Sequence, residues 1–211
     1  MLDITVVRFL SIFLAIVEVV SGVLFFGVFV QIRQGAGSVK VSKPVGFILR
    51  DVFLLLLALP LIFFLTGSAV PGWVYATPLN FSFSSAEYLQ LASVPIMLSG
   101  SVLFLWSGRV LGRYMRVEIE VREEHELVTR GPYSRIRHPT YTGHLMVELA
   151  AFFLFFHPVL ILGFLARAAI AYKRALMEEQ LLASEAGFGQ RYRDYMLRTG
   201  RFLPRLTGPR H

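Results

Sequence analysis

Hydrophobic residues gather into five long blocks that are separated by shorter polar segments. Residues 9–30 and 88–111 have the length and apolar composition of helices that cross a hydrocarbon layer of about 30 Å, and residues 51–66 form the centre of a third span, which we expect to begin a few residues earlier. Two more, residues 140–156 and 159–172, are separated only by a His-Pro pair, so we expect an antiparallel helical hairpin. The pattern therefore predicts an all-α, polytopic integral membrane protein with about five transmembrane helices, including the hairpin.

The segments around these blocks refine the prediction. Pro60 should kink the second block, because proline removes a backbone donor and clashes with the preceding turn. Residues 31–50 are expected to form a flexible loop, and residues 67–87 an exposed loop against the membrane interface. The last block should continue as an amphipathic helix as far as Gly187, and the basic, aromatic tail beyond it should fold back over the membrane surface.

Composition and charge place the protein in a membrane and orient it. With 55% hydrophobic residues, 17% charged residues and a mean hydropathy of +0.60, the chain is too apolar for an ordinary soluble domain. Much of its Lys and Arg lies in residues 31–50, residues 112–139 and the tail, whereas residues 67–87 contain neither. The positive-inside rule then predicts that the basic segments are cytoplasmic and that the N-terminus and residues 67–87 face the other side. Because the basic residues alternate with apolar blocks, the net charge of +7 indicates contacts with lipid headgroups, and no nucleic acid is expected as a partner.

Cysteine and histidine usage excludes several kinds of site. The absence of Cys excludes disulfides, thiolate metal sites and a Cys nucleophile, and the five His residues form no ligand pair, so no metal is expected. No signal-peptide cleavage site follows the first block, which should remain as a span. We interpret residues 1–108 as an N-terminal region of three spans and residues 109–211 as a catalytic region. The sequence leaves the oligomeric state open.

Candidate chemistry lies in the polar segment HELVTRGPYSRIRHPTYTG, residues 125–143. Its Gly-Pro pair predicts a turn, and Pro139 predicts a helix start, whose free N–H groups suit a carboxylate or a phosphate. The Arg-His pair before Pro139 adds charge and donors, while Tyr133 and Tyr141 offer aromatic faces to a purine or a sulfonium cation. The same residues also fit a basic loop that only fixes topology and contacts headgroups.

A second polar cluster follows the hairpin. Arg174 and Glu178 are four residues apart on one helical face, and Glu179 lies beside them. Such a pair is often an exposed ion pair of little energetic weight. Because the hairpin returns this helix to the membrane surface where residues 125–143 lie, the two clusters can instead converge on one ligand.

These motifs resemble the isoprenylcysteine carboxyl methyltransferases and their relatives, which include phospholipid N-methyltransferases. The resemblance covers roughly residues 109–205. It implies S-adenosylmethionine-dependent methyl transfer, with S-adenosylhomocysteine as product, in a cytoplasmic pocket closed by the C-terminal half of the chain. The matching residues are His125-Glu-Leu-Val128, Gly131-Pro-Tyr133, Arg137-His-Pro-Thr-Tyr141 with Gly143, Arg174 with Glu178-Glu179, and Phe188-Gly189, Tyr192, Tyr195 and Gly200-Arg-Phe202 with Pro204.

The resemblance implies roles for individual residues. Arg174 would bind the acceptor and form the catalytic pair with Glu178. Glu118 lies where the family can contribute another cofactor contact. The cofactor-binding residues would be His125, Glu126, Leu127, Val128, Tyr133, His138, Pro139, Thr140, Tyr141 and Glu178.

The acceptor has several candidates. A carboxylate is already ionised at neutral pH and needs only a cation such as Arg174 to orient it, so our first expectation is the carboxylate of a prenylcysteine-like substrate. A phospholipid or other lipophilic amine would first have to lose a proton, to Glu178, Glu179, His138 or His144. Two alternatives lie outside the transferases: an NADPH-dependent membrane reductase related to the sterol reductases, and a non-catalytic membrane scaffold.

Two acidic residues inside the apolar blocks should face the interior of the bundle, because a charge in hydrocarbon is costly. Glu148 lies about two helical turns beyond Tyr141. It is a candidate substrate-binding residue in a channel through which a lipophilic acceptor enters from the lipid bilayer, or else a buried hydrogen-bonded group. Glu18 is a weaker candidate of the same kind.

Overall fold

The predicted hairpin forms the centre of the C-terminal half. In the computed structural model, α6 (Pro139–Phe155) and α7 (Pro158–Leu182) are joined by Phe156 and His157. Each helix has a proline in its first turn, where the missing N–H costs nothing. The turn is closed by Phe156 in a left-handed conformation (φ 48°) and by the His157 side chain, which accepts a hydrogen bond from the Val159 N–H at 3.3 Å. The hairpin prediction is confirmed.

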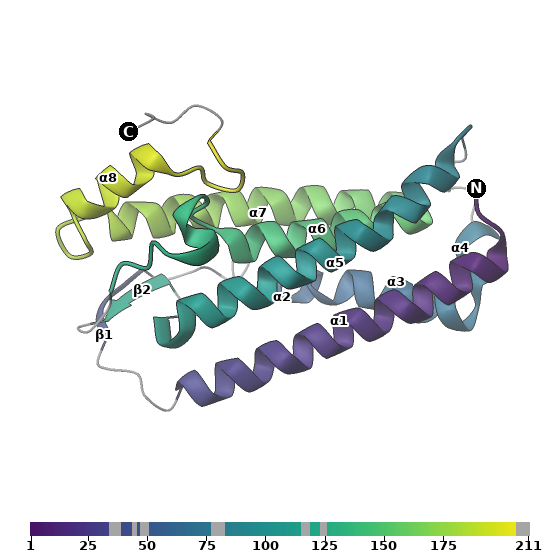
Figure 1. Cartoon of the computed structure of the whole chain (residues 1–211), viewed down its shortest axis with the longest axis horizontal. Helices are drawn as coiled ribbons and strands as arrows, with labels where there is room; N and C mark the ends of the chain where they lie inside the picture. The colour runs from purple at the N-terminus through teal and green to yellow at the C-terminus, as the bar shows by residue number, and fades with distance from the viewer. Residues whose placement is uncertain are drawn as a thin grey trace.

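The remaining helices pack along this hairpin as an elongated bundle (Figure 1). The structure describes residues 1–33, 39–43, 46, 51–76, 83–114, 119–122 and 126–205. Two short 3-10 helices, Gly112–Tyr114 and Gly131–Ser134, lie between the longer elements. The other elements are α1 (Ile4–Arg33), β1 (Val39–Lys43), α2 (Phe53–Leu56), α3 (Ala58–Ala69), α4 (Pro71–Ala76), α5 (Ala86–Leu111), β2 (Ile119–Arg122) and α8 (Gln190–Arg198).

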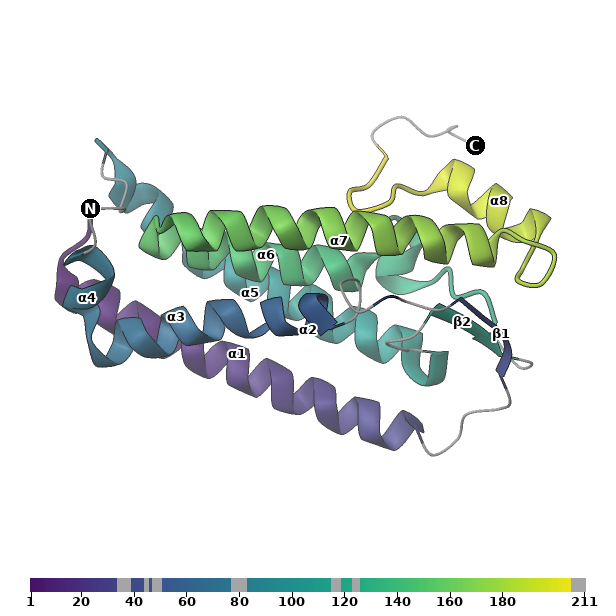
Figure 2. The same cartoon turned by 180° about the vertical axis from the view of Figure 1, so that it is seen from behind.

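The two ends of the bundle differ in character. One end contains the N-terminus and α4, and the opposite end contains β1, β2 and α8, as Figure 2 shows from behind. At the first end, the buried amide of Gln90 ties three elements together, because its Oε1 accepts from the Leu2 N–H and its Nε2 donates to the Leu154 carbonyl. The polar segments that carry the candidate chemistry gather at the second end.

The tightest helix contact joins α5 to α6. A Cβ added to Gly143 would lie 2.7 Å from the Gly100 carbonyl oxygen, and one added to Gly100 would lie 2.8 Å from the Gly143 carbonyl oxygen. Glycine at both positions therefore lets the two backbones touch, as small residues commonly do between membrane helices. This contact fixes the start of α6, and with it the candidate site, against α5.

Within the residues that the structure describes, two helices are long and apolar enough to cross a membrane, over Ile4–Gly27 and Ala86–Leu111. On α1, Phe9, Val23 and Phe26 are each about two-thirds exposed, which suits a lipid-facing surface better than an aqueous one. The predicted second span is present as the shorter apolar stretch Phe53–Ala69. The mostly helical fold is confirmed, and the five-span topology stays a prediction.

The structure corrects several details of the prediction. Residues 39–43, expected to be part of a flexible loop, pair as β1 with β2 in an antiparallel ribbon, so the fold is not entirely helical. Within the expected loop 67–87, α3 continues to Ala69 and residues 71–76 form α4, while residues 77–82 lie outside the described residues. The irregularity expected from Pro60 lies at Leu57, about one turn before the proline, where α2 ends and α3 begins. The proline ring would clash with the carbonyls of that preceding turn in a continuous helix.

The last long helix also ends earlier than predicted. α7 ends at Leu182, and its carbonyl accepts a hydrogen bond from the Phe188 N–H at 2.8 Å as the chain turns back. A Cβ at Gly187 would lie 2.5 Å from the Leu181 carbonyl oxygen. Gly187 is therefore required by this turn rather than by the end of the helix. Beyond it, α8 folds back toward the start of α6, where the Tyr195 hydroxyl donates to the Tyr133 carbonyl, and its expected place over the membrane surface stays a prediction.

Candidate functional site

A cavity of about 260 Å³ lies at the end of the bundle that contains β1, β2 and α8. Its lining has a polar part, made of ionisable side chains, and an apolar part, made of aliphatic and aromatic side chains. The lining residues are Phe25, Phe53, Leu54, Leu57, Phe104, Leu111, Tyr114, Ile119, Glu126, Leu127, Val128, Tyr133, Arg137, His138, Thr140, Tyr141, His144, Arg174, Glu178, Leu181, Leu182, Phe188, Tyr192 and Tyr195.

Most of the residues proposed from the sequence meet at this cavity. The ones that line it are Glu126, Leu127, Val128, Tyr133, His138, Thr140, Tyr141, Arg174 and Glu178. Pro139 is buried at the start of α6 and is not among the lining residues. His125 and Glu118 lie outside the described residues. The convergence of the two polar clusters in space is confirmed, whereas the individual roles stay predictions.

Glu148 does not line the cavity. Its Oε1 accepts a hydrogen bond from Arg167 Nη1 at 2.7 Å, and both side chains are buried. The structure therefore favours the second of the two sequence interpretations, a buried hydrogen-bonded group. Sequence reasoning missed Arg167. It lies about as far after the hairpin turn as Glu148 lies before it, and in an antiparallel helix pair such positions face each other.

The segment that follows α8 forms one edge of the site by pairing with the chain that enters α6. The Gly200 N–H donates to the Arg135 carbonyl at 3.0 Å, and the Gly200 carbonyl accepts from the Arg137 N–H at 2.9 Å. The His138 N–H donates to the Arg201 carbonyl at 3.0 Å. These bonds hold residues 199–202, here called the tail strap, alongside the start of α6.

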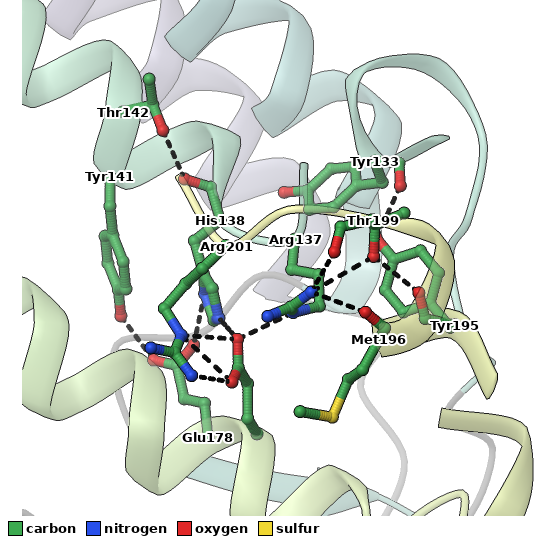
Figure 3. Close-up of polar contacts among 11 residues, drawn as sticks. Tyr133, Arg137, His138, Tyr141, Thr142, Glu178, Tyr195, Met196, Thr199 and Arg201 are labelled. Atoms are coloured by element: carbon green, nitrogen blue, oxygen red, sulfur yellow. Dashed lines mark hydrogen bonds and ion pairs between the residues drawn. The ribbon is translucent and has the colours of Figure 1, made fainter. Parts of the chain in front are cut away.

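A buried carboxylate connects the tail strap to both helices of the hairpin. Glu179 is 3% exposed, and its Oε1 accepts from Arg137 Nε at 2.8 Å while its Oε2 accepts from Arg201 Nη2 at 2.7 Å (Figure 3). Arg137 also donates to the Met196 carbonyl at 3.2 Å and to the Thr199 carbonyl. Two guanidinium groups therefore compensate the charge of one carboxylate, which allows it to be buried.

His138 lies between two carboxylates. Its Nδ1 is 3.4 Å from Glu178 Oε2, and its Nε2 is 3.3 Å from Glu179 Oε1. Both ring nitrogens must carry protons to serve both acceptors, so this geometry selects the imidazolium form. Burial alone would lower the pKa of His138, but the hydrogen bonds to Glu178 and Glu179 outweigh it, and the pKa is raised.

The two carboxylates shift in the opposite sense for the same reason. Burial would raise the pKa of each, yet the hydrogen bond to His138 is the largest opposing effect in both, and the pKa of Glu178 and of Glu179 is lowered. Both are ionised at neutral pH. The cavity therefore has an anionic group, Glu178, a quarter of which is exposed, backed by a fully compensated buried cluster.

Tyr141 connects Glu178, a candidate cofactor-binding residue, to Arg174, the candidate acceptor-binding residue. Its hydroxyl donates to Glu178 Oε1 and accepts from Arg174 Nε at 3.2 Å. Its ring stacks on that of His138 at an interplanar angle of 4° and a centroid distance of 5.5 Å. Arg174 and Glu178, which the sequence suggested as a simple ion pair, are therefore connected through a phenol that also lines the cavity.

The short segment before α6 is shaped by its glycine and proline. Gly131 has φ +60°, a conformation that suits glycine, and it opens the 3-10 helix Gly131–Ser134. This turn buries Tyr133, whose carbonyl accepts from the Tyr195 hydroxyl at 2.6 Å. Burial raises the pKa of Tyr133, so its phenol is neutral.

Sequence reasoning missed the apolar part of the wall and one cation. Phe25, Phe53, Leu54, Leu57 and Phe104 come from α1, from α2 with the turn that follows it, and from α5, where they look like any other residues of an apolar block. Arg201 was noted only as part of a motif, and its contact with Glu179 spans an irregular segment that no periodicity predicts.

Comparison with known proteins identifies the region that carries the site. Residues 93–184 match the model of the isoprenylcysteine carboxyl methyltransferase (ICMT) family. Three curated proteins named protein-S-isoprenylcysteine O-methyltransferase are similar to the chain. That of Tribolium castaneum is 32% identical over 93 residues, or 44% of this chain and 32% of its own. That of Dictyostelium discoideum is 35% identical over 80 residues, or 37% of this chain and 33% of its own. That of Xenopus laevis is 25% identical over 148 residues, or 68% of this chain and 51% of its own.

The chain thus spans between a third and a half of the length of these relatives. The matched region includes α6, α7 and the greater part of α5, together with most of the polar lining of the cavity. Residues 93–184, somewhat less than half of the chain, are therefore similar to the isoprenylcysteine carboxyl methyltransferase family.

Proposed function

We propose that this protein transfers a methyl group from S-adenosylmethionine to a lipophilic acceptor, the carboxylate of a prenylcysteine-like substrate. The proposal is carried by one observation, namely that a single cavity joins a polar part with Glu178 and Arg174 to an apolar part with Phe25, Leu54 and Phe104. Such a cavity suits a reaction between a charged, water-soluble donor and a greasy acceptor. The match of residues 93–184 to the model of a methyltransferase family supports the reaction class.

The residues at the polar part fit the proposed cofactor. A sulfonium compound with an amino acid and a nucleoside presents positive charge, hydroxyl groups and an aromatic base. Glu178 supplies an ionised acceptor for the charge or the hydroxyls, and Tyr133 and Tyr141 supply aromatic surface. When bound, the cofactor supplies the electrophilic methyl group. The protein has to align the partners and exclude water.

The acceptor residue in this proposal is Arg174. Its side chain is 2% exposed and lines the cavity, and its Nε is directed to the Tyr141 hydroxyl, so the guanidinium is held on one side. A guanidinium binds a carboxylate strongly without transferring a proton to it, so the acceptor stays ionised and nucleophilic. This property supports O-methylation of an acid, for which no general base is required.

We place the site at the cytoplasmic face of a membrane that the chain crosses several times. The two long apolar helices and the exposed apolar side chains of α1 support a lipid environment. The basic residues flanking the site support a cytoplasmic orientation with the N-terminus on the opposite side. In this arrangement α3, α6 and α7 complete a five-span bundle, the cofactor enters from the cytoplasm, and the acceptor enters sideways from the lipid.

Transfer of label tests the reaction and its product together. Membranes containing the protein are incubated with methyl-labelled S-adenosylmethionine and a prenylated N-acetylcysteine, and the labelled product is treated with base. We expect label that base releases, as from an ester. Label that resists base would indicate an amine product, and the absence of any transfer would refute the proposal.

Two variants test the assignment of residues. Arg174→Ala should abolish turnover while sparing the affinity for S-adenosylhomocysteine, measured by calorimetry in detergent, and Glu178→Ala should weaken that affinity itself. Lys173→Ala, at the exposed neighbour of Arg174 on α7, is the matched control and should change neither. Full activity of both site variants would contradict the assignment, and binding of NADPH in place of S-adenosylhomocysteine would indicate a reductase.

A further inference from the structure

An aromatic side chain from the first half of the chain contacts the proposed acceptor residue. Phe53, at the start of α2, is 8% exposed and lines the cavity. The guanidinium carbon of Arg174 lies 5.2 Å from the centroid of its ring, within the range of a cation–π interaction. Tyr141 meets the same ring edge-on at 5.6 Å. Phe53 therefore touches both groups that form the link to Glu178.

The ring is itself held from a second side. The guanidinium carbon of Arg167, two helical turns before Arg174 on α7, lies 4.6 Å from the Phe53 centroid. Arg167 is 1% exposed and is fixed by its ion pair with Glu148. The buried pair that does not line the cavity thus acts on the cavity through Phe53.

We propose that Phe53 is a positioning residue for Arg174 and a determinant of acceptor specificity, an inference that rests on the proposed function. An arginine side chain has several rotatable bonds, and fixing it before the acceptor arrives lowers the entropic cost of binding. The Phe53 ring restricts the Arg174 guanidinium from one direction, and the Tyr141 hydroxyl restricts it from another. The carboxylate of the acceptor then meets a preorganised cation.

The position of Phe53 along the cavity gives it the second role. Leu54 and Leu57, close to it in the chain, also line the cavity, so the ring has the Arg174 guanidinium on one side and aliphatic lining residues beside it in the chain. An acceptor whose carboxylate reaches Arg174 must lay the first part of its apolar chain against this ring. Phe53 lies outside residues 93–184, so the selectivity that it confers belongs to a part of the chain that the family match does not cover.

Kinetics with purified protein in lipid nanodiscs test this proposal. Phe53→Leu keeps an apolar side chain but removes the ring, and Phe53→Tyr keeps the ring. We expect Phe53→Leu to raise the KM for a prenylated N-acetylcysteine by about tenfold, which corresponds to loss of a desolvated cation–π contact. Phe53→Tyr should have a KM close to that of wild type. The affinity for S-adenosylhomocysteine should stay within about twofold of wild type, since Phe53 is not itself a proposed cofactor contact and its neighbour Tyr141 remains held by Glu178 and Arg174. Leu55→Ala is the matched control, because Leu55 lies on the same short helix, is 72% exposed and does not line the cavity.

A second variant changes the contact that Arg167 makes with the Phe53 ring. Arg167→Lys keeps a positive charge for Glu148 but removes the planar group that lies over Phe53, and it should raise the acceptor KM in the same direction with cofactor affinity retained. An unchanged acceptor KM in Phe53→Leu, or an equal loss of cofactor affinity, would overturn the inference while the wild-type activity still supports the proposed function. A wild-type protein that transfers no label to the carboxylate would refute the proposed function instead, and this inference with it.

Discussion

Removing the charge of Glu179 is the most direct perturbation of the site's framework. Glu179→Gln keeps the shape of the side chain, but it leaves Arg137, which is 7% exposed, without its anionic partner and the His138 imidazolium with Glu178 alone. Breaking a buried ion pair by neutralising one member costs about 3–5 kcal/mol. Arg201 is 24% exposed and can recover hydration, and the amide oxygen still accepts a hydrogen bond, so we expect the lower end, about 3 kcal/mol.

For a chain of this size, that loss corresponds to a fall of roughly 6–12 °C in Tm. The assay is thermal unfolding in detergent, followed by far-ultraviolet circular dichroism, with S-adenosylhomocysteine affinity measured in parallel. Glu185→Gln provides the control, since Glu185 is 92% exposed and its contact with Arg193 spans 3.7 Å, and its removal should leave Tm nearly unchanged. Equal Tm values for the two variants would show that Glu179 is not the centre of a compensated buried cluster.

Three further predictions follow from other contacts. Because the pKa of His138 is raised, the contribution of its imidazolium to stability is complete below the ordinary value of 6.5 and is lost as pH rises through the folded-state pKa. The same imidazolium contacts Glu178, so cofactor affinity should decline over that alkaline range. His138→Gln should abolish this pH dependence in calorimetric titrations. Tyr141→Phe should reduce kcat by roughly tenfold with an unchanged fold, measured by label transfer and circular dichroism, and undiminished turnover would exclude the phenol link. Gly143→Ala should destabilise the protein by about 1–3 kcal/mol in denaturant titrations, because the new methyl group meets α5 backbone, whereas Gly22→Ala, with no atom within 4 Å of the added Cβ, should not.

The sequence predicted the hairpin well because local signals define it. Pro139 and Pro158 can occupy the first turn of a helix but not its interior, and the two residues between the apolar blocks leave room only for a tight reversal. The same locality explains the convergence of Arg174 and Glu178 with His138, because an antiparallel pair returns α7 to the start of α6. Proximity of the two clusters follows from helix length alone.

Other features depend on contacts between distant segments, which a single sequence does not show. The strand at Val39–Lys43 is only five residues long, and it is ordered by pairing with Ile119–Arg122 about eighty residues later. Arg201 reaches Glu179 only because the tail strap pairs with the entry to α6. Phe53 lines the cavity from the short helix α2, and the apolar pattern of its block does not tell which of its side chains face inward.

The tail strap has a consequence for truncation of the protein. It supplies the second guanidinium of the buried cluster, from Arg201, and the backbone hydrogen bonds that flank the entry to α6. We expect a chain cut after Arg198 to keep the α6–α7 hairpin but to retain cofactor poorly, because Glu179 then loses one of its two guanidinium partners.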